Sequence, residues 1–250
     1  MNARVYKIGG PALEDPDLLG PLAAEVRGAE RPVVLVHGGG RQIERLLARL
    51  GIESRFVEGR RVTTPEAMDV VEMVLSGVVN KGLAAGLTAA GVAALGLSGR
   101  DAGLIRARLL PELGRVGQPE SVDVASLRSA WSAGCVPVVS PVSAGPAGEA
   151  VNVNADEVAL AIARALGARS LVYLSDVDGV ELDGEAAVSL LADTAQARIA
   201  DGAIGGGMVM KVRTALAACG AGIPEVVIAG RARLEGGFAG TSLHAAEALA

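Results

Sequence analysis

The sequence predicts an α/β protein in which a mainly parallel central sheet carries helices on both faces. Short apolar runs, such as residues 5–8, 33–37 and 170–174, alternate with longer segments of helical periodicity. This alternation is typical of parallel strands joined by helices. Glycines follow the first two runs directly, which leaves the backbone free to approach an anion with its N–H groups.

The expected elements follow the same pattern along the chain. Strands are predicted over residues 5–8, 33–37, 92–97 (a third central strand), 136–140, 170–174, 225–229 and, as a short tail, 236–243. Residues 56–62 are expected to be extended, and 105–116 to form one or two hairpins. Helices are predicted over 18–26, 43–50, 124–133, 157–166 and 208–219, and another from Thr64 with a break near Gly77.

Residue types at the helix ends support these boundaries. Thr64 is expected to cap a helix that has Pro65 at its first position. Asn154 and its neighbours are expected to begin the helix over 157–166, and Gly167 to end it. Gly167 also marks the expected boundary between two lobes, residues 1–168 and 169–250.

Composition excludes several classes of protein. Half of the 250 residues are apolar and the formal net charge is −5, so no basic surface for nucleic acid is expected. Two cysteines give neither a disulfide framework nor a zinc spacing, which suits a reducing cytoplasm. The uncharged stretch 82–99 contains five glycines and is expected to be a buried helix end, a turn and a strand, so no membrane span is predicted.

The lysines give the sharpest indication of function. The chain has only three, Lys7, Lys81 and Lys211, and two of them lie beside glycine clusters. The clusters are Gly9–Gly10, Gly38–Gly40 and Gly205–Gly207, and together they are interpreted as parts of one phosphate-handling site. None of them matches a Walker, protein-kinase or dinucleotide signature.

Two lysines, several backbone N–H groups and one acidic residue at a helix start suit phosphoryl transfer. That reaction depends on charge stabilisation and alignment more than on covalent participation of the protein. Asp156 is the acidic residue in question. Its alternative reading is a helix cap without any catalytic part.

The order of the motifs resembles the amino acid kinase family and, within it, the N-acetylglutamate kinases, along nearly the whole chain. The matching segments are 7–10 (KIGG), 37–40 (HGGG), 59–63 (GRRVT), 79–81 (VNK), 96–101 (GLSGRD), 152–156 (NVNAD), 174–179 (LSDVDG) and 206–208 (GGM) with Lys211. The resemblance implies a three-layer αβα sandwich of the carbamate kinase-like type with two lobes. Residues 1–168 would bind the acyl amino acid and dimerise, and residues 169–250 would bind ATP.

The resemblance also implies the reaction and the site residues. ATP, accompanied by Mg²⁺ that the nucleotide carries, would phosphorylate the γ-carboxylate of N-acetyl-L-glutamate in arginine biosynthesis. The implied catalytic residues are Lys7, Lys211 and Asp156. The implied substrate-binding residues are Gly39, Gly40, Arg61 and Asn152. The implied nucleotide-binding residues are Gly9, Gly10, Ser175, Asp176, Gly179, Gly207 and Met208, and no protein metal ligands are expected.

Three positions depart from the family pattern. Arg60 stands where an apolar residue usually precedes the clamping arginine, so either Arg60 or Arg61 could hold the substrate carboxylate. Gly205 and Met210 also differ, and are expected to change loop stiffness rather than chemistry. Lys81 receives no role from the sequence.

The remaining expectations concern partners and rival functions. The chain is expected to be cytoplasmic. It is also expected to be a homodimer insensitive to arginine, because it begins directly at the first strand without the extra helix of arginine-inhibited relatives, and its tail over 233–240 is short. The rival readings are a kinase for aminoadipate or glutamate on a carrier protein, and a non-catalytic nucleotide or amino-acid sensor with the same fold.

Overall fold

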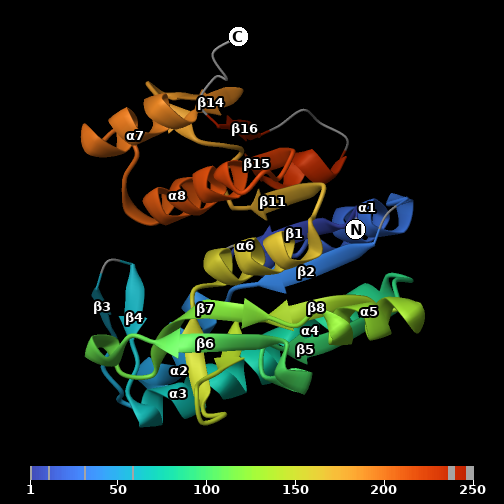
Figure 1. Cartoon of the computed structure of the whole chain (residues 1–250), viewed down its shortest axis with the longest axis vertical. Coiled ribbons are helices and arrows are strands. Elements are labelled where there is room, and N and C mark those ends of the chain that lie inside the picture. The colour runs from blue at the N-terminus through green and yellow to red at the C-terminus, as the bar shows by residue number, and fades with distance from the viewer. Residues whose placement is uncertain (1, 11, 31, 58, 236–239, 246–250) are drawn as a thin grey trace.

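A computed structural model describes residues 2–245 except 11, 31, 58 and 236–239, and its centre is an eight-stranded sheet (Figure 1). Its order is β14 (Ser189–Leu191), β16 (Thr241–His244), β15 (Glu225–Ala229), β11 (Ser170–Leu174), β1 (Arg4–Ile8), β2 (Val33–His37), β8 (Val136–Ser140) and β5 (Ala94–Ser98). Every pair is parallel except β15 with β16. The prediction of a mainly parallel sheet is confirmed, but the strand predicted over 92–97 lies at the sheet edge and not in its centre.

Alternation along β1 explains the three layers. Val5 faces one core cluster with α6 (Ala155–Leu166), α8 (Gly206–Gly220) and α5 (Ala125–Ser132). Tyr6 faces a second cluster with α1 (Leu19–Gly28) and α4 (Asn80–Ala89). Successive side chains of a strand point to opposite faces, so the sheet is covered on both sides as predicted.

A long helical run covers one end of the sheet. It comprises α3 (Pro65–Glu72), a π-helical segment η2 (Met73–Val79) and α4, and it packs with α2 (Gly40–Arg49) in a third apolar cluster. The Thr64 hydroxyl accepts a hydrogen bond from the N–H of Ala67 at 3.1 Å, as expected of its cap. The break predicted near Gly77 is wrong, because the chain continues through the π-helical turn.

Smaller sheets flank the central one. β6 (Ile105–Leu109), β7 (Val116–Val122), β9 (Val142–Ala144) and β10 (Ala150–Val153) close into a small barrel. Two hairpins stand apart, β3 (Arg55–Val57) with β4 (Arg60–Val62), and β12 (Glu181–Leu182) with β13 (Glu185–Ala186). The last of these hairpins, β14 and α7 (Ala192–Ala200) were not predicted. Short 3₁₀ turns complete the described elements: η1 (Ala12–Glu14), η3 (Asp101–Gly103), η4 (Pro111–Leu113) and η5 (Arg231–Glu235).

Both ends of α6 follow the sequence prediction. Asn154 accepts a hydrogen bond from the N–H of Asp156 at 2.8 Å, and Gly167 ends the helix in the left-handed region at φ 56°. The lobe boundary after residue 168 falls between α6 and β11, which belong to one continuous set of layers, so the two-lobe division stays a prediction. The tail strand predicted over 236–243 is observed only as β16, since residues 236–239 lie outside the described part.

One helical run in the described part of the chain, Pro65–Ala89, is long and apolar enough to cross a membrane on length and composition alone. Within its most apolar window 44% of the residues are buried. The uncharged stretch 82–99 forms the end of α4, a turn at Gly91 (φ 84°) and β5, as predicted.

Candidate active site

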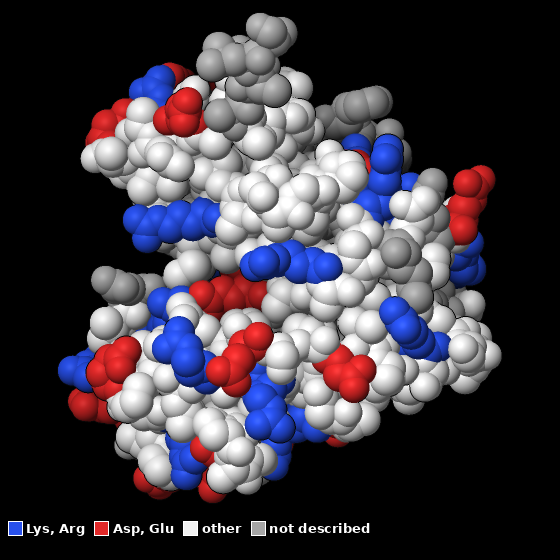
Figure 2. Space-filling view, in the orientation of Figure 1, with Lys and Arg blue, Asp and Glu red and all other residues white. Residues whose placement is uncertain are grey.

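The candidate site is a cavity of about 550 Å³ at the carboxyl ends of β1 and β2. Figure 2 shows the molecule hollowed between the part that carries β3–β4 and the part that carries α8. The strands β1, β2, β11 and β15 run parallel, so their carboxyl ends meet at one sheet edge. Open α/β sheets bind ligands at that edge.

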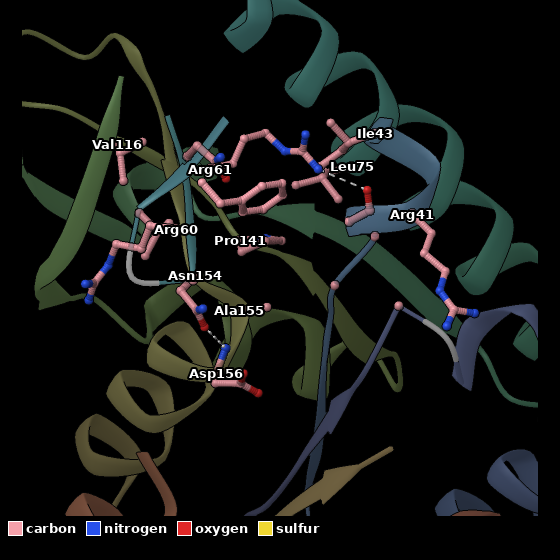
Figure 3. Close-up of a pocket in the computed structure, with 18 of the residues that line it drawn as sticks. Arg41, Ile43, Arg60, Arg61, Leu75, Val116, Pro141, Asn154, Ala155 and Asp156 are labelled. Atoms are coloured by element: carbon pink, nitrogen blue, oxygen red, sulfur yellow. Dashed lines mark hydrogen bonds between the residues drawn. The ribbon is translucent and has the colours of Figure 1, made fainter. Parts of the chain in front are cut away.

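A buried ion pair lies at one wall of the cavity. Nζ of Lys7, on β1, lies 2.9 Å from Oδ1 of Asp156, in the first turn of α6, and about nine-tenths of each side chain is hidden from solvent. The partial positive charge at the start of a helix favours a carboxylate there. The Asn154 cap fixes that first turn (Figure 3). The structure therefore brings together two of the three residues predicted to be catalytic.

Lys211, the third residue predicted to be catalytic, lies on α8 and interacts electrostatically with Lys7 and Asp156. Burial and the positive charge of Lys7 lower the pKa of Lys211 from its ordinary value, while the charges of Asp156 and Asp176 oppose this shift. Two cations that interact through space around one carboxylate form a region suited to a polyanion.

The glycine turns after β1 and β2 approach each other closely. A Cβ added to Gly10 would lie 3.4 Å from the backbone nitrogen of Gly40, and one added to Gly39 would lie 2.6 Å from a methyl carbon of Leu75. Gly39 and Gly40 begin α2, whose N-terminus faces the cavity. Gly9 does not line this cavity, and its N–H donates to the carbonyl of Leu174 at 2.9 Å.

Arg61 lies on β4, and its guanidinium lies over an aromatic ring. Its guanidinium lies 2.6 Å from Oε2 of Glu44 and 3.2 Å from the carbonyl oxygen of Gly40, contacts the Ser54 hydroxyl, and has its Cζ 4.6 Å from the centre of the Phe56 ring. Burial lowers the pKa of Arg61, and the charge of Glu44 opposes this. A carboxylate therefore already contacts this guanidinium.

Arg60 and Arg61 turn in different directions. Figure 3 shows the Arg61 side chain running toward Ile43 and Leu75, while the Arg60 guanidinium turns away. Arg60 pairs with Glu157 of α6. Both arginines contribute to the cavity wall, but Arg61 is the one whose guanidinium contacts α2 at the glycine loop. This geometry favours Arg61 over Arg60 as the arginine that holds the substrate carboxylate, and that role stays a prediction.

Asn152 of β10 connects the barrel to the hairpin that carries these arginines. Its amide donates to the hydroxyl of Thr63 at 3.1 Å, and that hydroxyl donates to the carbonyl of Arg61 at 2.7 Å. Asn152 also lines the cavity. It therefore lies near Arg61, as predicted, and is linked to it through Thr63.

The residues predicted to bind nucleotide lie in several separate places. Ser175 and Asp176 line a second cavity, of about 330 Å³, that Gly230 also lines. The Ser175 hydroxyl lies 3.1 Å from Oδ1 of Asp176. Gly179 instead packs against β16, where an added Cβ would lie 2.7 Å from the Thr241 hydroxyl.

Gly207 and Met208 lie in the first turn of α8, and Met208 packs partly against the core. Neither lines the two cavities just described. Lys211, on the same helix, interacts electrostatically with Asp156, beside the first cavity, and with Asp176, beside the second.

Several residues at the site were not singled out from the sequence. Glu44, Phe56 and Glu157 are the chief ones, each touching an arginine of the β3–β4 hairpin. Glu44 lies one helical turn after Gly40, which is the local signal that it would face the same side of α2. Nothing local relates Glu157 to Arg60.

The chain belongs to the amino acid kinase family, whose model matches residues 2–230. Among its relatives is the acetylglutamate kinase of Chloroflexus aurantiacus, 44% identical over 238 residues that cover 93% of this chain and 94% of the relative. The acetylglutamate kinase of Deinococcus radiodurans is 48% identical over 233 residues, covering 90% and 91%.

Solved structures agree with this assignment. The protein smu.665 from Streptococcus mutans superposes with a TM-score of 0.85 at 26% identity, covering 97% of this chain and 98% of that one. Carbamate kinase from Giardia lamblia has a TM-score of 0.70 at 15% identity over 98% of both chains, which supports the fold alone. The predicted αβα fold of the carbamate kinase-like type is thereby confirmed.

Proposed function

We propose that this protein transfers the γ-phosphoryl group of ATP to the side-chain carboxylate of N-acetyl-L-glutamate, giving N-acetyl-L-glutamyl 5-phosphate in arginine biosynthesis. The observation that carries the proposal is the buried Lys7–Asp156 pair in a cavity whose opposite wall holds Arg61. Acetylglutamate kinases 40–48% identical over most of the chain support the same reaction.

The reaction needs no general base, because the nucleophilic carboxylate is already ionised at neutral pH. The buried His37 suits this absence of base chemistry, since burial lowers its pKa to about 4 and leaves it neutral. Lys7 and Lys211 would neutralise the charge on the phosphoryl group during transfer, and Asp156 would hold Lys7 in position.

The substrate would be oriented by the opposite wall. Its free α-carboxylate would bind Arg61, replacing or sharing the contact that Glu44 now makes, and Asn152 would lie beside it. The N–H groups of Gly10, Gly39 and Gly40 would face the transferred phosphoryl group, helped by the start of α2.

The nucleotide would lie on the side of residues 169–250, along Ser175, Asp176 and the first turn of α8, with residues 1–168 holding the acyl amino acid. Gly9, which bonds Leu174 through its N–H, and Gly179, which packs against β16, would support this side. Among the described residues no group of three or more His, Cys, Asp or Glu side chains is placed to hold a metal ion. Mg²⁺ would therefore be held through the nucleotide phosphates.

A homodimer would cover the exposed apolar side chains of the long helical run and of the sheet edge. Met73, Val78 and Leu95 are 56%, 71% and 42% exposed, and β5 is an edge strand. A second copy on this face would also explain why the helical run Pro65–Ala89 is so apolar, without requiring that it cross a membrane. A cytoplasmic location suits the two free thiols, Cys135 and Cys219.

The test is formation of acyl phosphate from ATP and N-acetyl-L-glutamate, trapped with hydroxylamine. We expect hydroxamate with this substrate and little with free glutamate, whose charged amine replaces the acetyl group. ATP binding without hydroxamate would instead indicate a sensor. Product from a carrier-bound aminoadipate but not from N-acetyl-L-glutamate would indicate the rival kinase.

A further inference from the structure

The β3–β4 hairpin has little apolar support of its own. It is a separate two-stranded sheet, and all three residues of β3 are exposed. An isolated hairpin is marginally stable in water. What holds it against the cavity must therefore include its side-chain contacts to other elements.

Those contacts are made by two consecutive arginines that reach two different helices. Arg61 pairs with Glu44 of α2, and Arg60 pairs with Glu157 of α6. The Arg60 and Glu157 side chains are only 15% and 16% exposed, so their interaction is screened little by solvent. The hairpin is thus held to both sides of the cavity mouth.

We propose that the Arg60–Glu157 pair is a latch that holds the β3–β4 hairpin over the cavity, and that Arg60 is a positioning residue of the acyl-amino-acid pocket. Glu157 follows Asp156 directly, so the latch attaches the hairpin to the helical turn that holds the Lys7 partner. The kinetic part of this inference rests on the proposed function, whereas the part about hairpin position does not.

The electrostatics of Glu157 explain why Arg60 matters to that turn. Burial raises the pKa of Glu157, the charge and hydrogen bond of Arg60 oppose this, the charge of Asp156 adds to it, and a hydrogen bond with Gln118 is a smaller opposing cause. Without Arg60, two neighbouring carboxylates would share one poorly solvated turn. Loss of the latch therefore affects the position of the hairpin and the charge balance beside Asp156 together.

The pair is also suited to open and close. Arg60 Nε is buried without a hydrogen-bond partner among the described residues, and Arg60 reaches Glu157 through one nitrogen only, so the contact is not a bidentate fork. A single contact is weaker than a parallel pair of hydrogen bonds. The hairpin can thus be released to admit the substrate and held again afterwards.

The experiment compares Arg60→Leu, Glu157→Gln, the double variant and Arg60→Lys with the unchanged protein. Arg233→Leu is the matched control, because it breaks another partly buried arginine–glutamate pair, Arg233–Glu225 at 2.8 Å. Two quantities are measured: amide hydrogen exchange of residues 55–57 and 60–62 without substrate, and KM for each substrate together with kcat.

We expect exchange in the hairpin to rise about tenfold in Arg60→Leu and in Glu157→Gln, and no further in the double variant, because the two residues act as one contact. KM for N-acetyl-L-glutamate should rise about tenfold while KM for ATP stays within about twofold. Arg60→Lys should recover most of both effects, and Arg233→Leu should change neither.

Hairpin exchange equal to that of the unchanged protein in Arg60→Leu would overturn the latch, as would additive effects in the double variant. Exchange that rises while KM for N-acetyl-L-glutamate is unaffected would overturn the positioning role. If the proposed function is wrong, the unchanged protein itself will form no acyl phosphate. The hydrogen-exchange measurement needs no turnover, so it still tests the latch in that case.

Discussion

The side-chain amide of Asn80 lies 3.1 Å from Nε2 of His37, and both residues are wholly buried. The amide also donates to the carbonyl of Val138 at 2.9 Å, and Nδ1 of His37 donates to the carbonyl of Gly38 at 2.8 Å. This arrangement requires a neutral imidazole with its proton on Nδ1. The contact attaches the end of β2, where the glycine loop begins, to the long helical run.

Lys81 joins the same network. Its Nζ donates to the side-chain oxygen Oδ1 of Asn80 at 3.2 Å and to the backbone carbonyl of Gly96 at 2.7 Å. Lys81, whose role could not be predicted from sequence, therefore links α4 to the edge strand β5.

His37 should make the protein less stable in mild acid. Burial, with the charges of Lys7 and Lys81, lowers its pKa from 6.5 to about 4 against the opposing hydrogen bond to Gly38. Between these two values the unfolded chain binds the extra proton and the folded protein does not, so the free energy of unfolding falls as pH falls from 6.5 to 4, by up to about 3 kcal/mol.

Urea unfolding at pH 7 and pH 5 measures this effect. His37→Gln should remove most of the pH dependence, whereas His244→Gln, at an exposed position, should keep it. Equal pH dependence in His37→Gln and the unchanged protein would contradict the assignment.

Lys7 should be needed for turnover and not for folding. Lys7→Ala removes a positive charge held beside the cavity by Asp156, and we expect kcat to fall by about two orders of magnitude or more. Circular dichroism should remain that of the folded protein. A kcat within tenfold of the unchanged enzyme would contradict this role.

The alkaline limb of the pH–activity profile, where kcat is lost at high pH, should shift when the charge of Asp176 is removed. The charge of Asp176 raises the pKa of Lys211, against burial and the charge of Lys7, which lower it. Asp176→Asn should therefore lower that pKa further and move the loss of kcat at high pH to a lower pH. Glu181→Gln, at an exposed position of β12, is the control and should leave the limb in place. A limb that moves upward in Asp176→Asn would exclude Lys211 as the titrating group.

Arg61 should determine affinity for the acyl amino acid. Arg61→Lys keeps a charge but loses the planar fork, and we expect KM for N-acetyl-L-glutamate to rise at least about tenfold with little change for ATP. Arg41 also lines the cavity but is largely exposed and paired with Glu14, so Arg41→Lys should have a small effect. Similar KM values in both variants would argue against Arg61 as the carboxylate clamp.

Local signals were sufficient for most of the fold. The strand at residues 170–174, the Asn154 cap and the left-handed Gly167 each follow from neighbouring residue types. The edge position of β5 could not be predicted, since sheet order depends on packing between distant segments. The π-helical segment at 73–79 was also not predicted, because its apolar residues are equally compatible with an ordinary α-helix.

In the candidate site too, some features could be predicted from the sequence and others depend on contacts between distant residues. Lys7 and Asp156 were both predicted as catalytic residues from a family resemblance, and the structure joins them in one ion pair. The contact of Arg60 joins residues 97 positions apart, so no local pattern could predict Glu157 as its partner. Nor could the sequence alone decide between the two adjacent arginines, since both suit a carboxylate and only side-chain direction separates them.

A dimer through the β5 edge makes a distinct prediction about mass in solution. Val78 lies in the π-helical segment with 71% of its surface exposed, and Leu95 lies on the edge strand. A carboxylate at the centre of an apolar interface must be desolvated without a partner, which is unfavourable. Val78→Glu should therefore shift the protein toward the monomer in analytical ultracentrifugation, and Leu95→Asp should do the same. Val188→Asp, at a position 81% exposed beside β14, should leave the mass unchanged. A dimer that persists in both interface variants would mean that this face is not where the copies meet.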